Sequence, residues 1–495
     1  MERLIEILKP LLSYDPASPL IFSSGLFLYL FVGFLGLYYL LRRTTTARIL
    51  YVILFSLYFY YKSSGMFFVL LLLVATSDYM IGYSLFLTEG KRMRKFLVAM
   101  SVVLNLSLLG YFKYTNFFID LTNQLVGEGM FEFQNIFLPV GISFFVFQSM
   151  SYTIDIYRRK LRPLDSWLDY LFYLSFFPQL VAGPIVRASD FIPQIRRRPV
   201  VTREMLGSAL FLLLTGLFKK AVISDYIALN FVDRIFDEPL LYSGVECLVG
   251  IYGYSLQIYC DFSGYSDMAI GLALLMGFRF PKNFDAPYHS ATITEFWRRW
   301  HISLSSWLRD YLYISLGGNR KGKLRTYLNL LITMLLGGLW HGAAIRFVLW
   351  GALHGVALAL HKVWLSFVPG AKMLGKEMNP VMRLLGVLFT FHLVAFGWLI
   401  FRADSMQTVE LMLHQIFTAF DLSLLPQLVE GYAASMLLLA VGYLLHLSPS
   451  RLDEWMRGRI GRAPMGVQVV LLVAVIWLVM QVKSADIQPF IYFQF

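Results

Sequence analysis

One histidine stands at the end of an almost wholly apolar stretch of the chain. His341 closes a run that starts at Tyr327, and Gly338, Trp340 and Gly342 flank it. An ionisable side chain inside a membrane-type segment is costly, so it indicates a functional site by default. The imidazole pKa suits general acid–base catalysis near neutral pH, and the flanking glycines would let a substrate approach the ring closely. The alternative is a core histidine that is hydrogen-bonded to a backbone carbonyl.

A second histidine lies in a segment with helical periodicity. Thr292 and Glu295 have capping-box spacing, which predicts that a helix begins there and continues through residues 292–313. At 100° per residue, Trp300 and His301 fall on the apolar side, whereas the arginines fall mainly on the other side. The pattern predicts one amphipathic helix that lies along a membrane interface or dips into a bundle.

Other polar residues support weaker hypotheses. His354 and His361 are seven residues apart on one helix face, but no carboxylate or thiolate lies near them in sequence, so no metal site is predicted. Asp261 and Asp267 lie beside an apolar segment together with Ser263 and Ser266, which favours a structural polar network. The two cysteines of the chain give neither a disulfide framework nor zinc spacing.

The composition indicates which kind of fold must position these residues. Of the 495 residues, 58% are hydrophobic and 15% are charged, and the mean hydropathy is +0.62. Soluble domains are about 45–50% apolar and about 25% charged. A single soluble core also stops growing at roughly 250–300 residues, so lipid must cover much of this apolar surface. The composition therefore predicts an all-α, polytopic membrane protein.

The apolar runs agree with this class. A spanning helix needs about 20 largely apolar residues. Roughly a dozen runs approach that length, and a shorter one at 49–61 is a partial or tilted span. The runs are 20–41, 65–87, 96–118, 137–156, 167–186, 205–225, 244–259, 327–340, 347–367, 381–401, 433–447 and 467–480. Several are short or are broken by Gly and Pro, which favours helices that stop inside the protein, because irregular backbone at membrane depth needs protein or water around it.

The charge distribution and the absence of a linker indicate which partners and which domain organisation to expect. The net charge is +12, but the basic residues lie in loops between apolar runs, as in the cytoplasmic loops of membrane proteins. A nucleic-acid partner is therefore not expected. No linker divides the chain, so residues 1–495 are predicted to form a single transmembrane domain. The first apolar run is long enough to remain as an anchor, and no cleavable signal peptide is expected.

Several stretches of the chain resemble the membrane-bound O-acyltransferase family, above all its bacterial branch of alginate O-acetylation and teichoic acid D-alanyl transfer proteins. In order, they are 141–145 (GISFF) with 155–158 (DIYR), 177–184 (FPQLVAGP), 261–267 (DFSGYSD), 296–301 (FWRRWH), 337–342 (GGLWHG), and 397–398 (GW) with 401–403 (FRA). The resemblance covers nearly the whole chain beyond residue 65, and its two histidine motifs together are highly specific. One departure follows the second motif, where Ile345 and Arg346 replace small or aromatic residues. Arg346 is predicted to snorkel to the surface, with binding of a substrate phosphate or carboxylate as the alternative.

The resemblance implies a bundle of helices, some of them short or re-entrant, around a central tunnel. An acyl thioester would enter from the cytoplasm and an acceptor hydroxyl from the opposite side. His341 would act as the general base, and His301 would polarise the thioester carbonyl or share the proton. The residues expected to line the tunnel come from the matching motifs: Trp340, Gly342, Gly338, Trp300, Asp261, Asp267 and Gln179.

The aromatic C-terminal tail, residues 487–495, allows two interpretations. Tyr492 and its neighbours could anchor the chain at the membrane interface. The tail is also similar to that of a small partner protein in teichoic acid D-alanylation. That likeness implies an acyl relay, in which the Tyr492 phenolate attacks the thioester and passes the acyl group outward.

The expected reaction is therefore transfer of a short acyl group, with acetyl favoured, toward an extracytoplasmic cell-envelope polysaccharide or exopolysaccharide. The donor would be acetyl-CoA or another acyl thioester, with no bound cofactor. A separate extracytoplasmic transferase is an expected partner, and the expected location is the bacterial cytoplasmic (inner) membrane. The alternatives are D-alanyl transfer to teichoic acids, O-acylation of a lipid or protein, and, in another class, a transporter or flippase that uses the same cavity without chemistry.

Overall fold

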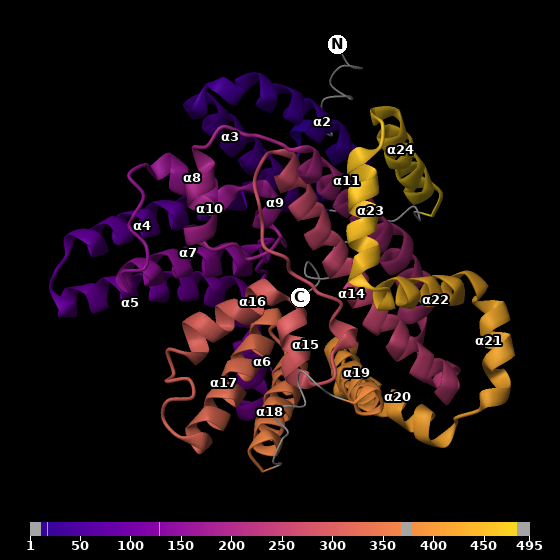
Figure 1. Cartoon of the computed structure of the whole chain (residues 1–495). Helices are drawn as coiled ribbons and strands as arrows, with labels where there is room; N and C mark the ends of the chain where they lie inside the picture. The colour runs from indigo at the N-terminus through magenta and orange to yellow at the C-terminus, as the bar shows by residue number, and fades with distance from the viewer. Residues whose placement is uncertain (1–10, 17, 128, 368–378, 483–495) are drawn as a thin grey trace. The chain divides into compact units, whose positions relative to one another are not determined.

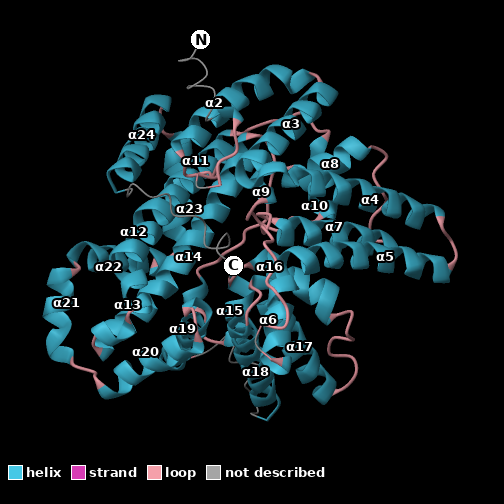
Figure 2. Ribbon diagram, turned by 180° about the vertical axis from the view of Figure 1, so that it is seen from behind, coloured by secondary structure: helices cyan, strands magenta, loops and turns pink. Residues whose placement is uncertain are grey.

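The computed structural model describes residues 11–16, 18–127, 129–367 and 379–482. Figure 2 shows that this part of the chain consists of helices joined by loops and contains no strand. The all-α prediction is confirmed.

The chain divides into two compact units, which are described separately. The first comprises residues 1–209 and 268–281, and the second comprises 210–267 and 282–495. The helix α14, Gly244–Leu275, contributes to both units, and so does α11, Arg203–Leu217. Because the division describes packing, the single-domain hypothesis stays a prediction.

The first unit is built from helices α2 to α10. They are α2 (Gly25–Leu40), α3 (Thr45–Ser64), α4 (Phe68–Leu87), α5 (Lys91–Leu109), α6 (Thr115–Val126), α7 (Ile142–Tyr157), α8 (Trp167–Ser175), α9 (Phe177–Leu180) and α10 (Ala188–Ile195). Phe177 at the start of α9 is buried among rings from α2 and α3, including Phe34 at 5.5 Å and Phe55 at 5.1 Å between centroids. A four-residue helix has little stability of its own, so this aromatic cluster must hold α9 in place.

The second unit contains the remaining helices. They are α12 (Asp225–Ile227), α13 (Asp233–Asp237), α15 (Ile293–Arg299), α16 (Ile302–Trp307), α17 (Lys323–His341), α18 (Ile345–Phe367), α19 (Pro380–Arg402), α20 (Met406–Thr418), α21 (Leu425–Gly431), α22 (Ala433–Leu447), α23 (Ser450–Arg462) and α24 (Met465–Val482). Short π-helices at Phe218–Ser224, Ala228–Val232 and Leu308–Tyr313 interrupt the α-helices. Such π-turns inside α-helices are frequent at functional sites.

The number of membrane spans differs from the roughly dozen apolar runs in the sequence. Within the described residues, six helical segments are long and apolar enough to cross a membrane, or seven if the bent pair α21–α22 is one span. The run at 167–186 is divided between α8 and α9, and the run at 137–156 becomes α7, a 16-residue helix that is buried along nearly its whole length. Apolar runs that are buried in protein have the same composition as runs that face lipid, so composition alone overcounted the spans.

Candidate active site

The helical hairpin α17–α18 places His341 at the last residue of α17, which packs side by side with α18 (Figure 1). A Cβ on Gly338 would lie 2.1 Å from the carbonyl oxygen of Phe347, and one on Gly351 would lie 2.3 Å from that of Met334. These glycines therefore let the two backbones approach as closely as in small-residue helix pairs of membrane proteins. The close approach fixes the end of α17, and with it His341.

His341 is buried in an aromatic environment, with 3% of its surface exposed. Its ring centroid lies 5.1 Å from Trp340, 5.1 Å from Trp350 and 5.5 Å from Phe401, in edge-to-face geometry. These rings hold the imidazole in a water-poor site, where electrostatic interactions are stronger than in water.

The predicted helix over 292–313 exists, but it is broken at His301. Its start is confirmed, since the Thr292 hydroxyl accepts from the Glu295 amide at 3.1 Å. The helix α15 then ends, and His301 adopts a left-handed conformation, with φ 41° and ψ 57°, before α16 begins. The prediction of one continuous amphipathic helix is therefore wrong. A non-glycine residue in this conformation is strained and persists only where its surroundings hold it, a situation common at active sites.

Asn283 is the residue that holds this turn. Its carbonyl oxygen accepts from the Ile302 amide at 2.8 Å, and its side-chain oxygen accepts from both the amide and the hydroxyl of Ser303, at 3.2 and 2.8 Å. Its side-chain amide donates to the Ser266 hydroxyl of α14 at 3.0 Å. Asn283 was not predicted as a site residue. Its signal in the sequence, an Asn in a polar loop, is too common to be specific.

The two histidines that the sequence singled out belong to one buried cluster. The His301 ring contacts Phe262 at 4.5 Å and Trp340 at 6.1 Å, and Trp340 in turn contacts His341. His301 is fully buried, and this burial lowers the pKa of its imidazole to about 3. His301 is thus neutral at physiological pH, so it can donate one hydrogen bond without carrying a charge.

Trp300, the neighbour of His301, is part of the same aromatic packing. Its ring lies 4.8 Å from Trp398 and 5.1 Å from Phe284. The Trp398 indole nitrogen donates to the Tyr288 hydroxyl at 3.2 Å, which ties α19 to the loop before α15.

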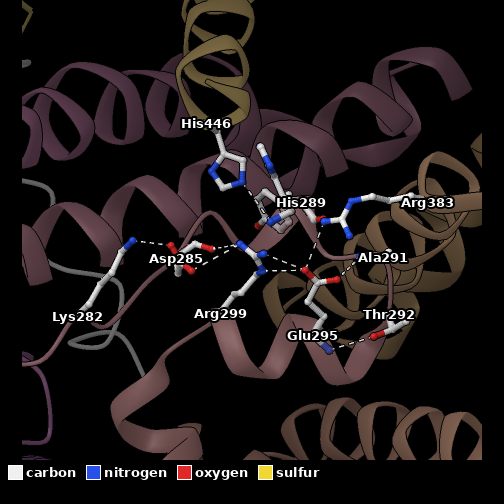
Figure 3. A network of polar contacts seen from close by, with 10 residues as sticks. Lys282, Asp285, His289, Ala291, Thr292, Glu295, Arg299, Arg383 and His446 are labelled. Atoms are coloured by element: carbon white, nitrogen blue, oxygen red, sulfur yellow. Dashed lines mark hydrogen bonds and ion pairs between the residues drawn. The ribbon is translucent and has the colours of Figure 1, made fainter. Parts of the chain in front are cut away.

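A polar network fixes that loop and the start of α15 (Figure 3). Arg299 donates to Glu295 at 3.0 Å and to the backbone oxygen of Asp285 at 3.1 Å. Glu295 also accepts from the Ala291 amide at 2.9 Å. Burial raises the pKa of Asp285, but Lys282 and Arg299 outweigh it, so the pKa of this carboxyl lies below its usual value. The network anchors the loop that carries Asn283.

Asp261 and Asp267 pair with two lysines that the sequence analysis overlooked. Lys220 lies 2.5 Å from Asp261 and 2.8 Å from Asp225, and Lys219 lies 2.8 Å from Asp267. The favoured interpretation of the two aspartates, a structural polar network, agrees with these ion pairs. The available signal was the pair of lysines within the apolar run 205–225, because intramembrane charges are rare and usually paired.

The remaining predicted residues have these locations. Gln179 is buried in α9 of the first unit, where its amide donates to the Tyr173 oxygen at 2.5 Å. A Cβ on Gly342 would collide with the Phe347 ring, so Gly342, like Gly338, serves helix packing, and its place in a tunnel stays a prediction. Arg346 donates to the Ala403 oxygen and so joins α18 to the end of α19.

Two further predictions concern the tail and the other histidines. Tyr492 lies outside the described residues. The His361 ring nitrogen hydrogen-bonds the Thr294 hydroxyl at 2.7 Å, and His354 packs against Trp350. No group of three or more His, Cys, Asp or Glu side chains in the described ranges could hold a metal ion.

Comparison with known proteins gives a consistent family. Residues 53–401 match the family model described as MBOAT, membrane-bound O-acyltransferase family. The chain is 42% identical to a probable alginate O-acetylase, AlgI, of Pseudomonas aeruginosa, over 81% of this chain and 75% of the relative. It is 37% identical to a peptidoglycan O-acetyltransferase of Helicobacter pylori, over 67% of this chain and 66% of the relative. A teichoic acid D-alanyltransferase of Bacillus subtilis is more distant, at 28% identity over 54% of this chain and 69% of the relative.

The matched region contains both histidines, the lysine–aspartate pairs and the α17–α18 hairpin. The described part of the chain also supplies at least six helices that can cross a membrane. The protein is therefore a multi-pass membrane enzyme that belongs to the membrane-bound O-acyltransferase family.

Proposed function

We propose that this enzyme transfers an acetyl group from a cytoplasmic thioester, acetyl-CoA or another acyl thioester, toward an extracytoplasmic polysaccharide of the bacterial cell envelope. The observation that carries the proposal is the contact of His301 and His341 with the same ring, Trp340, inside one buried aromatic cluster. The relatives named for alginate, peptidoglycan and teichoic acid support an envelope polymer as the final acceptor. The proposed location is the bacterial inner membrane.

The proposed reaction uses His341 as general base. A ring nitrogen takes the proton of the acceptor hydroxyl, and the oxygen attacks the thioester carbonyl carbon. As the new C–O bond forms, the C–S bond breaks, and the thiolate leaves as a thiol with the proton from His341. His301, neutral in its buried site, donates a hydrogen bond to the carbonyl oxygen as negative charge develops there.

The immediate acceptor in this proposal is the phenol of Tyr492. Because a phenol has a pKa near 10, an acyl-tyrosine remains activated toward a second hydroxyl. A separate extracytoplasmic transferase then moves the acetyl group to the polymer. Mass spectrometry of the trapped intermediate should find 42 mass units, roughly one acetyl group, on the C-terminal peptide, and Tyr492→Phe should abolish this mass. Wild-type polymer acetylation in Tyr492→Phe would end the relay hypothesis.

The general-base role is tested with labelled acetyl-CoA and purified protein in proteoliposomes. His341→Ala should lower acetyl transfer by about 10²- to 10⁴-fold, the usual contribution of general acid–base catalysis. His414→Ala removes an exposed histidine of α20, whose side-chain contact is to Thr418 of the same helix, and is the matched control, with activity near that of the wild type. If the His341→Ala protein kept the full activity of the wild type, the transporter alternative would be favoured instead.

A further inference from the structure

The helix α23 has one side that is both basic and exposed. At 100° per residue, five of its side chains fall within an arc of about 100°. These five residues, all of them exposed, are the basic face of α23: Arg451, Leu452, Trp455, Arg459 and Arg462. The face thus combines three arginines with a tryptophan and a leucine, side chains that commonly lie at membrane interfaces.

The other side of α23 packs against the second unit and fixes this orientation. The Arg457 guanidinium lies 4.9 Å from the ring centroid of Phe211 in α11. Gly461 is buried, and the Gln468 side chain donates to the Ile460 backbone oxygen at 2.9 Å, which ties the start of α24 to α23. Because turning the helix would break these contacts, the basic face stays exposed.

The three arginines of the basic face are not paired with any carboxylate of the described residues. Of the two acidic residues in α23, Asp453 lies on the opposite side of the helix and Glu454 lies at the edge of the face. The Arg459 guanidinium lies 5.3 Å from the centroid of the Trp455 ring, a cation–π contact that holds its charge beside the indole. The basic face therefore presents a net positive charge to its surroundings.

The helices on either side show where α23 lies in the membrane. It connects α22 to α24 (Figure 1), and these two apolar helices expose Leu444, Leu447, Met465 and Val470 close to α23. In a membrane protein, lipid covers such side chains. The 13 residues of α23 span about 20 Å, less than the roughly 30 Å of a hydrocarbon core, and its arginines are too costly to bury there. The helix therefore lies along the membrane interface.

From this arrangement we infer that the basic face of α23 binds the headgroups of anionic phospholipids. Guanidinium groups form bidentate hydrogen bonds with phosphate, and Trp455 and Leu452 can enter the boundary between headgroups and acyl chains. A basic residue near an anionic surface raises the local lipid concentration by about fivefold. The apolar surfaces of α22 and α24 beside the face favour lipid over an acidic protein as the occupant. The inference is independent of the proposed acyl transfer.

A fluorescent label at the edge of the basic face tests this inference in the full-length protein. Glu454→Cys provides the attachment site, and the native Cys247 and Cys260 are buried and should not react. The labelled protein is placed in phosphatidylcholine vesicles that contain a trace of phosphatidylglycerol or phosphatidylcholine with a fluorescent acyl chain. Energy transfer to phosphatidylglycerol should exceed transfer to phosphatidylcholine by about threefold or more, and high salt should reduce this ratio.

Removing the charges of the basic face should abolish the preference. In the labelled protein, the triple variant Arg451→Gln/Arg459→Gln/Arg462→Gln should bring the ratio close to one. The same three positions changed to Lys keep the charge and should retain most of the preference, because attraction to anionic lipid depends mainly on charge. Since all three side chains are exposed, both variants should fold, and equal melting temperatures in detergent would confirm that they do.

The matched control removes three exposed basic residues before α17 through Arg320→Gln/Lys321→Gln/Lys323→Gln and should leave the ratio unchanged. An equal loss in this control would overturn the inference, because net charge and not α23 would then attract the lipid. A ratio near one in the protein with an intact basic face, as expected if the face binds an acidic protein instead, would overturn it as well. So would a ratio that survives the Gln substitutions in α23. The measurement requires no acyl donor, so its outcome does not depend on the proposed reaction.

Discussion

At the scale of single residues, the second unit buries ionisable groups in two different ways. Lys220 is compensated by two carboxylates, Asp261 and Asp225, and all three are on or beside helices of the same unit. His301 is surrounded by aromatic rings, so burial keeps it neutral. A charge without compensation is far more costly than a neutral imidazole, which is why the lysine needs its carboxylates and the histidine does not.

Removing the buried lysine should therefore be severe. Lys220→Met leaves Asp261 as an uncompensated buried carboxylate, and the expected loss is about 3–5 kcal/mol of folding free energy. Lys219→Met is the matched control. Its pair with Asp267 is 20–25% exposed, so the loss should be smaller. Melting temperatures in detergent measure both changes, and the double variant Lys220→Met/Asp261→Asn should recover part of the loss. Equal melting temperatures for the two lysine variants would contradict this account.

The neutral state of His301 predicts a loss of stability in acid. Its folded pKa, about 3, lies below the unfolded value of about 6.5, so the unfolded chain binds a proton first as the pH falls. The contribution of this group is complete above pH 6.5 and is lost below it, by about 2 kcal/mol at pH 5. His301→Asn does not titrate in this range and tolerates the left-handed backbone, so its melting temperature should fall less between pH 7 and pH 5. An identical fall in both proteins would refute the buried neutral imidazole.

At the scale of elements, the site depends on two backbone features: the close α17–α18 contact and the break between α15 and α16. The first places His341, and the second places His301. In both cases a residue without catalytic chemistry, Gly351 or Asn283, determines the position of the histidine.

The helix contact is tested by adding one methyl group. Gly351→Ala would place its Cβ 2.3 Å from the Met334 oxygen, so α17 and α18 must separate, and both the melting temperature and acetyl transfer should fall. Gly33→Ala on α2 is the matched control, since nothing lies within 4 Å of a Cβ there, and it should be neutral or slightly stabilising. A neutral Gly351→Ala would show that the hairpin does not need its close approach.

The break before α16 is tested through Asn283. Asn283→Ala removes the acceptor for Ser303 and the donor to Ser266, so the His301 turn loses its support. Transfer should fall by about tenfold or more, mainly in kcat, because a misplaced polarising group affects the transition state more than donor binding. The control is Ser305→Ala, which removes a hydroxyl that donates to the backbone oxygen of Trp300. Its effect on transfer should be smaller. A larger effect in Ser305→Ala than in Asn283→Ala would exclude the assigned role.

At the scale of the whole molecule, the basic loops between apolar helices predict the orientation in the membrane. Lys321 is exposed in the loop before α17, next to several further basic residues, so the positive-inside rule places this loop in the cytoplasm. Lys321→Cys should react with a membrane-impermeant maleimide only in inside-out vesicles. The native Cys247 and Cys260 are buried and should stay unlabelled in both orientations. Labelling of Lys321→Cys in right-side-out vesicles would reverse the assignment.

The sequence by itself determined the class of the protein, and it singled out two histidines that the folded chain brings into one buried cluster. So many apolar residues require lipid around them, and backbone in lipid must satisfy its own hydrogen bonds, as it does in helices. The all-α membrane fold therefore followed from composition without coordinates. His341 stood out for the same reason, because an ionisable residue at the end of an apolar run is costly wherever the run lies. The capping box at Thr292 is local in sequence, and it too was correctly predicted.

Only the tertiary structure decided which apolar runs can cross the membrane, where the helix breaks at His301, and which partners balance the buried charges. Each of these depends on contacts between residues far apart in the chain, such as Lys220 with Asp261 and Asn283 with Ser303. Local propensity favours a continuous helix through His301, but the hydrogen bonds of Asn283 stabilise the strained turn instead. Periodicity contains no information about such long-range bonds, so the position of His301 could be obtained only from the folded chain.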